Sequence, residues 1–88
     1  MSYAVTQRVW ESSQASGEVL LVALALADFA MNGEGTGWPS ARQLREMTRL
    51  DGGACGRALA ELERLGEVVI DDHELGVVRF QFTEAFRA

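Results

Sequence analysis

The sequence predicts a mainly α-helical domain with a small β-hairpin, an α+β fold of three helices followed by two or three short strands. Three segments have the periodicity or the end signals of helices. Near residue 68 the hydrophobic period changes to two, which is typical of strands. The chain has 88 residues, of which 48% are hydrophobic. This length and composition indicate one globular domain.

We expect three parts along the chain. Residues 1–16 form a polar N-terminal arm, 17–83 the folded domain and 84–88 a C-terminal tail. The apolar residues of the arm are Tyr3, Val5, Val9 and Trp10. We expect a short arm or helix that lays Trp10 on the domain, and we expect Trp38 to pack into the core.

The first expected helix runs from Gly17 to Met31. Glu18 lies in its first turn, where it complements the helix dipole, and the Asn32-Gly33 pair ends it. Between Val19 and Met31 only Asp28 is charged. A helix that is apolar all round is buried on several sides. Either it is the central helix of the domain, or a second chain covers one face. For a homodimer, the expected interface residues are Leu20, Leu24 and Phe29.

Two further helices are expected in the middle of the chain. Ser40 is a suitable N-cap for a helix from Ala41 to Arg49, and Asp51 for one that runs to about Leu65, where Gly66 ends it. In the first of these, one face carries Leu44, Met47 and Thr48, and the other carries Arg42, Arg45 and Arg49. The inner face of the second carries Cys55, Leu59, Leu62 and Leu65.

A β-hairpin is expected after the last helix. The inward residues alternate with polar neighbours and are Val68, Ile70, Val78, Phe80 and Phe82. The turn between the strands runs from Asp71 to Gly76, and the segment at Trp38 adds a short third strand.

Several motifs occur in this order of elements. They are Ala25-Leu26-Ala27-Asp28, Trp38-Pro39-Ser40, Leu44, the run from Arg57 to Glu63 (RALAELE), and Gly66. From Trp10 to Phe82 the chain resembles the winged helix-turn-helix domains of bacterial and phage replication-initiator-like and transcriptional regulatory proteins. The resemblance implies a small regulator of transcription or replication that binds double-stranded DNA, and the apolar helix from Val19 to Met31 favours a homodimer.

Charge is distributed unevenly along the chain. The formal net charge is −5, which repels DNA at long range. Residues 41–65, however, carry five of the eight arginines. We expect Arg42, Arg45 and Arg49 to contact phosphates and Arg57 to enter the groove, with Arg64 further along the same face. The alternatives are a solvated face partly neutralised by Glu46 and an Arg57–Glu61 pair at i,i+4.

Two features depart from the DNA-binding pattern. The last helix begins with Gly52-Gly53-Ala54, where DNA-binding members of the family present side chains to the major groove. Either the bare helix start approaches a phosphate, or a protein partner packs there. The hairpin turn contains Asp71, Asp72, His73 and Glu74, which repel phosphates. Because the turn does not suit DNA, we expect it to be either a solvated turn or an acidic surface that binds a basic protein. The alternative function is therefore a protein-interaction module that modulates a nucleic-acid-processing protein without reading DNA.

Other classes of function lack support in the sequence. We expect no enzyme activity, metal or cofactor, because His73 has only turn neighbours and Cys55 lies on an inner face without a base. A single cysteine excludes an intramolecular disulfide and fits a reducing compartment. The longest apolar run, Val19 to Ala27, is too short to cross a bilayer. We therefore expect a cytoplasmic protein that does not enter the membrane.

Overall fold

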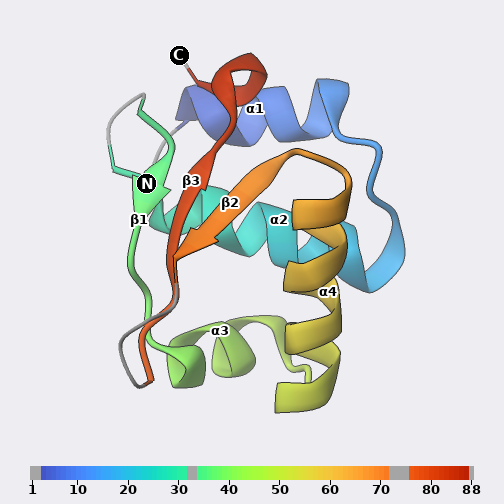
Figure 1. Ribbon diagram of the computed structural model, residues 1–88, viewed down its shortest axis with the longest axis vertical. Coiled ribbons are helices and arrows are strands. Elements are labelled where there is room, and N and C mark those ends of the chain that lie inside the picture. The colour runs from blue at the N-terminus through green and yellow to red at the C-terminus, as the bar shows by residue number, and fades with distance from the viewer. Residues whose placement is uncertain (1–2, 32–33, 72–75, 88) are drawn as a thin grey trace.

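A small antiparallel sheet packs with one face against the helices. The computed structural model describes residues 3–31, 34–71 and 76–87. In these ranges the elements are α1 (Tyr3–Ser12), α2 (Gly17–Phe29), β1 (Thr36–Gly37), α3 (Ala41–Thr48), α4 (Gly52–Arg64), β2 (Val68–Asp71), β3 (Arg79–Phe82) and the 3₁₀ turn η1 (Glu84–Phe86) (Figure 1). The predicted α+β class is confirmed. The prediction of three helices was wrong, because four α-helices are present in the described residues.

The sheet has the strand order β1-β3-β2. Gln81 in β3 pairs with Thr36 on one side and with Val69 on the other. The expected hairpin is confirmed in its strands, whereas residues 72–75 of its turn lie outside the described part. The third strand, expected at Trp38, ends one residue earlier at Gly37. A Cβ at position 37 would lie 2.6 Å from the carbonyl oxygen of Phe29, so only glycine allows β1 to lie this close to the end of α2.

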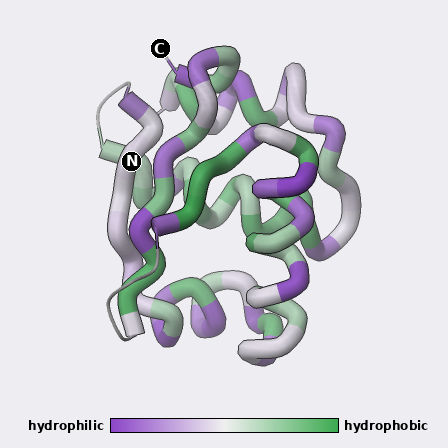
Figure 2. The backbone as a smooth tube through the Cα atoms, in the orientation of Figure 1, coloured by the Kyte–Doolittle hydropathy of each residue, from purple (hydrophilic) through white to green (hydrophobic). Residues whose placement is uncertain are grey.

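Helix α2 is the centre of the core. It lies behind the sheet in Figure 1 and packs against α1, α3, α4 and β1. It ends at Phe29, two residues before the expected end, because Met31 donates a backbone hydrogen bond to Thr36 over 2.7 Å. Figure 2 shows hydrophobic residues along α2 and the hairpin strands, with hydrophilic positions on the outer helices. The apolar surface of α2 is thus largely covered by other elements of this chain.

The three residues expected at a dimer interface are half-buried against that core: Leu20, Leu24 and Phe29. The interface itself stays a prediction. Within the described residues, no helix is long and apolar enough to cross a bilayer.

Helix α1 forms inside the expected arm and completes the core with its apolar side. Val5 and Val9 are buried, and Phe86 of η1 is buried beside them. The expectation that the tryptophans pack inward was wrong, since Trp10 is 65% and Trp38 is 61% exposed. The small valines, one helical turn apart, fill the space between α1 and α2, and Trp10 lies on the opposite side of α1.

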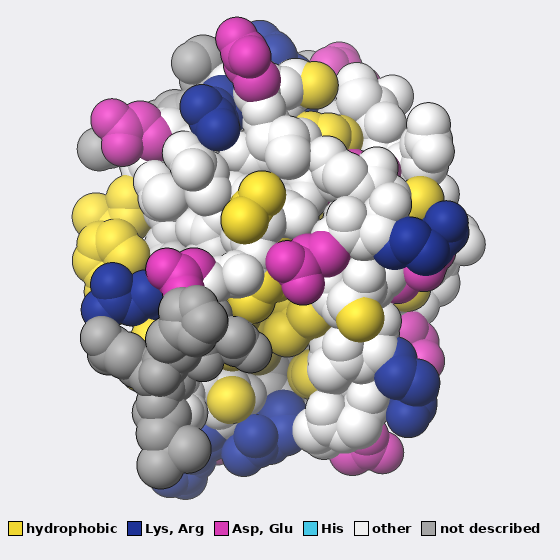
Figure 3. Space-filling view, viewed as in Figure 1, with side chains coloured by type: hydrophobic (Ala, Val, Ile, Leu, Met, Phe, Trp, Pro, Cys, Tyr) yellow, Lys and Arg dark blue, Asp and Glu magenta, His cyan; other side chains and the backbone are white. Residues whose placement is uncertain are grey.

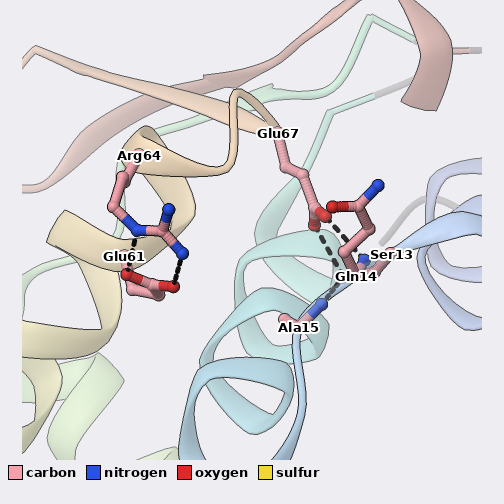
Figure 4. Close-up of polar contacts among 6 residues, drawn as sticks. All are labelled: Ser13, Gln14, Ala15, Glu61, Arg64 and Glu67. Atoms are coloured by element: carbon pink, nitrogen blue, oxygen red, sulfur yellow. Dashed lines mark hydrogen bonds and ion pairs between the residues drawn. The ribbon is translucent and has the colours of Figure 1, made fainter.

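A buried carboxylate joins α4, the sheet and the α1–α2 connection. Glu67 is only 3% exposed. Its Oε1 accepts a hydrogen bond from Ser13 Oγ at 2.6 Å, and its Oε2 accepts one from the backbone N–H of Gln14 at 2.7 Å (Figure 4). Ser13 Oγ in turn accepts from the backbone N–H of Ala15 at 3.0 Å. Because the carboxylate replaces its water with these donors, it is satisfied in the interior.

Candidate nucleic-acid interface

Helix α3 is fixed at its start by a reciprocal capping arrangement. Ser40 Oγ accepts from the backbone N–H of Gln43 at 2.9 Å, and Gln43 Oε1 accepts from the backbone N–H of Ser40 at 2.8 Å. Such a capping box satisfies two of the helix's unpaired N–H groups. Leu44 and Thr48 face the interior as expected. Met47 does not, because it is 43% exposed. The buried side of α3 is therefore narrower than the sequence suggested.

The opposite side of α3 presents the predicted arginines to solvent. Arg42, Arg45 and Arg49 are all exposed. Arg42 Nε lies 3.2 Å from Glu46 Oε2, so the expected partial neutralisation occurs at this position. Within the described residues, no ion pair involves Arg45 or Arg49. Two guanidinium groups on this face are thus available to an anionic ligand.

Arg49 ends α3 in an unusual backbone conformation. Its φ is 62°, in the left-handed region where glycine is the usual residue at a helix end. A non-glycine residue there carries a conformational cost. The reversal brings Asp51 into position two residues later, and Asp51 Oδ1 accepts from the backbone N–H of Ala54 at 2.8 Å. The expected cap of α4 is confirmed, and the two helices are joined by a tight turn.

The start of α4 lies between two arginine side chains. Gly52 and Gly53 are exposed. A Cβ built at Gly52 would lie 3.8 Å from Arg45 Cδ, and one built at Gly53 would lie 3.3 Å from Arg57 Nη1. Arg45 therefore lies beside the helix start from α3, and Arg57 folds back over it from α4 itself.

The remaining predicted site residue, Arg64, has a partner of its own. Arg64 Nε donates to Glu61 Oε1 at 2.7 Å, and the pair forms a second contact through Nη2 and Oε2 (Figure 4). The hydrogen bond from Arg64 lowers the pKa of Glu61, and the same bond raises the pKa of Arg64. The alternative Arg57–Glu61 pair is not present, because Glu61 pairs with Arg64, three residues toward the C-terminus. This leaves Arg57, rather than Arg64, as the uncompensated charge on α4.

An apolar groove lies beside these charges. Its volume is about 180 Å³, and its apolar lining includes Leu44, Cys55, Leu59 and Val78. Arg45 lines the same groove, together with Gly52 and Gly56. Figure 3 shows the exposed hydrophobic surface between the hairpin and α4, with basic side chains below it over α3. This groove was not predicted from the sequence, although Gly52 and Gly56, one turn apart on an otherwise good helix, indicate a surface without side chains.

Among the described residues we find neither a metal site nor an exposed nucleophilic cysteine. In those ranges, no group of three His, Cys, Asp or Glu side chains is arranged to hold a metal ion. Cys55 is buried, with Sγ 3.7 Å from Thr48 Oγ1. The site that the structure brings together is therefore Arg45, Arg49 and Arg57 around the α3–α4 turn, with Arg42 beside it and Arg64 apart from it.

Comparisons with protein-family models, with curated proteins and with solved structures returned no match.

Proposed function

We propose that this chain is a small winged-helix protein that binds double-stranded DNA and regulates transcription or replication. The observation that carries the proposal is the group of exposed arginines at the turn between α3 and α4. The order strand, helix, turn, helix, hairpin supports it, because a helix-turn-helix followed by a hairpin is a recurrent DNA-binding arrangement.

In the proposed complex, the first helix of the motif crosses the DNA backbone and the second enters the major groove. Arg42, Arg45 and Arg49 of α3 then contact phosphates, which fixes position without reading sequence. Gly52 and Gly53 add no side-chain bulk, so the backbone at the start of α4 approaches the duplex closely. The acidic remainder of the chain restricts contact to this surface.

Sequence reading in this complex depends on Arg57. The sequence of α4 is GGACGRALAELER, which contains no Asn, Gln, Ser, Thr or Lys. Arginine is the residue that most often pairs with guanine in the major groove. Because Arg64 is engaged by Glu61, Arg57 is the donor left for a base edge. We therefore expect modest sequence preference.

Charge reversal tests the proposal. Arg45→Glu and Arg57→Glu should each lower the affinity for a mixed-sequence duplex at least tenfold at low salt, measured by fluorescence anisotropy. Arg8→Glu is the matched control, because Arg8 is exposed on α1, away from α3 and α4, and among the described residues its side chain donates a hydrogen bond to the carbonyl oxygen of Ala85, at 3.3 Å. Equal losses in all three variants, or no binding of any duplex by the wild type, would refute the proposal.

A second candidate function follows from the groove between α3 and α4. Its apolar lining beside Arg45 favours a protein-interaction module, and the acidic balance of the chain suits a basic partner. In that case the chain modulates a nucleic-acid-processing protein without reading DNA. A stoichiometric protein partner in a pull-down, together with no retention on a DNA column, would favour this candidate over the first.

A further inference from the structure

Exposed hydrophobic side chains gather on the outer face of the sheet. Met31 is 50%, Trp38 is 61% and Val69 is 58% exposed. In Figure 1 α2 lies behind the sheet and no helix lies in front of it. Large exposed apolar patches on a soluble domain mark interaction surfaces.

The strand register places these residues on one surface. Thr36, Gln81 and Val69 are partners across the three strands, and Met31 forms a β-bridge with Thr36. Directly opposite residues in antiparallel strands share a face. The buried Phe80 and Phe82 alternate with these positions and face the core. The outer face is therefore continuous from Met31 to Val69.

The same face contains a hollow, and the charges of its described lining residues cancel. A hollow of about 420 Å³ is lined by Trp38, Val69, Gln81 and Thr36, and also by Asp71 and Arg79. Asp71 and Arg79 are cross-strand partners, and they are the only charged residues in the described lining. Figure 3 shows hydrophobic, basic and acidic side chains side by side over this part of the molecule.

We propose that this face binds a second copy of the same chain in a two-fold symmetric dimer. In such an interface each patch meets itself, so its charges must complement their own copies. One arginine beside one aspartate meets this condition: Arg79 of one copy faces Asp71 of the other, and vice versa. Among the described residues of this face, a polyanion or a strongly basic protein would find no net charge to bind, although the chain as a whole carries −5.

The expected association is reversible and leaves α3 and α4 open. A three-stranded sheet offers a small contact area, and small interfaces belong to the weak class. We therefore expect a dissociation constant on the order of 10 µM. The inference does not depend on DNA binding, because the dimer forms through the sheet alone.

The two exposed tryptophans provide a matched test. Sedimentation equilibrium should show a monomer–dimer equilibrium for the wild type. Trp38→Ser should shift it to monomer, whereas Trp10→Ser, the same substitution at an equally exposed residue of α1, should leave it unchanged. A wild type that stays monomeric at about 1 mM, far above the expected constant, overturns the proposal. So does dissociation by Trp10→Ser without dissociation by Trp38→Ser.

A charge-swap mixture tests the two-fold pairing directly. Arg79→Glu leaves two acidic groups on the face, and Asp71→Arg leaves two basic groups. Each variant alone should be monomeric, with circular dichroism confirming that it is folded. Mixed in equal amounts, they should form a heterodimer, detected by native mass spectrometry. Because each variant carries two groups of like charge at these positions, dimers that form only in the mixture indicate pairing of opposite charges between chains. A mixture that stays monomeric overturns the proposal.

Discussion

Glu67 is the residue whose environment differs most from what its side chain suggests. It follows the glycine that ends α4, a position where an acidic residue ordinarily points to water. Here its carboxylate accepts hydrogen bonds from Ser13 and Gln14, and its backbone carbonyl oxygen accepts one from the N–H of Thr83 at 2.9 Å. One residue therefore connects segments that lie more than fifty positions apart in the chain.

Replacing this carboxylate should destabilise the fold. In Glu67→Gln the negative charge is lost and an N–H₂ group replaces one acceptor oxygen, which weakens the hydrogen bonds from Ser13 and Gln14, so we expect a loss of about 1–3 kcal/mol in the free energy of unfolding. Urea denaturation measures it. Glu84→Gln is the control, because Glu84 is exposed on η1. Equal midpoints for the two variants would show that the buried hydrogen bonds contribute little.

Two glycines that differ only in backbone conformation give a second prediction. A Cβ at Gly56 or at Gly66 meets no atom within 4 Å, but Gly66 has a φ of +75°, whereas Gly56 is helical. Gly56→Ala should therefore raise stability by up to about 1 kcal/mol. Gly66→Ala should lower it by about 1 kcal/mol, the cost of a left-handed alanine.

These substitutions also bear on the proposed function. If the bare surface of α4 lies against DNA, Gly56→Ala should bind DNA more weakly although it is more stable. Thermal unfolding and duplex binding, measured on the same samples, separate the two effects. Unchanged DNA affinity in the stabilised variant would show that Gly56 is not at the contact.

At the scale of elements, α1 was the hardest to predict. Its inner side consists of Val5 and Val9, a stripe too narrow to stand out in ten residues. The large aromatic residues of α1, Tyr3 and Trp10, are the most conspicuous apolar side chains in its sequence, but both are exposed. The caps of α3 and α4 were predictable, because Ser40 and Asp51 act through neighbours three residues away. The burial of Glu67 was not predictable from the sequence, since its hydrogen-bond partners come from a distant segment.

The different burial of Val9 and Trp10 on α1 can be tested by substitution. Val9→Ala should lower the free energy of unfolding by about 2 kcal/mol, because it removes two buried methyl groups and leaves a cavity. Trp10→Ala removes a much larger side chain, yet it should change stability by less than about 0.5 kcal/mol, as is usual at exposed positions. Chemical denaturation of both variants checks the order. A larger loss at Trp10 would contradict the packing of α1.

The candidate site was predictable only where it depends on local spacing along the chain. The helical spacing of Arg42, Arg45 and Arg49 placed them on one exposed face, and this is a local property. The choice of partner for Glu61 depended on rotamers and went to Arg64 instead of Arg57. The outer sheet face required the register of three strands, one of them only two residues long.

At the scale of the whole molecule, most of the positive charge of an acidic chain is concentrated in α3 and α4, which carry or adjoin five of the eight arginines. DNA binding should therefore depend on salt with a moderate slope, because only a few phosphates are contacted. With Arg42, Arg45 and Arg49 on phosphates, the logarithm of the association constant should fall with the logarithm of the salt concentration with a slope of about −3 per bound chain.

This slope can be measured between low and moderate salt by fluorescence anisotropy. Arg45→Gln should reduce its magnitude by about 1 and weaken binding similarly for all sequences. Arg57→Gln should instead reduce discrimination between sequences. Identical salt dependence in the wild type and Arg45→Gln would remove Arg45 from the phosphate contacts.

The contact between α1 and η1 also determines when the protein can fold during its synthesis. Phe86 is buried against the first helix, and Arg8 reaches the carbonyl oxygen of Ala85. In the nascent chain Val5 and Val9 are therefore synthesised well before Phe86, the residue that covers them, and they stay uncovered until Phe86 has been added. Until that moment the central helix lacks part of its covering, so the native core cannot close around a partial chain. Folding of this domain is expected to be a single event that follows translation of residue 86.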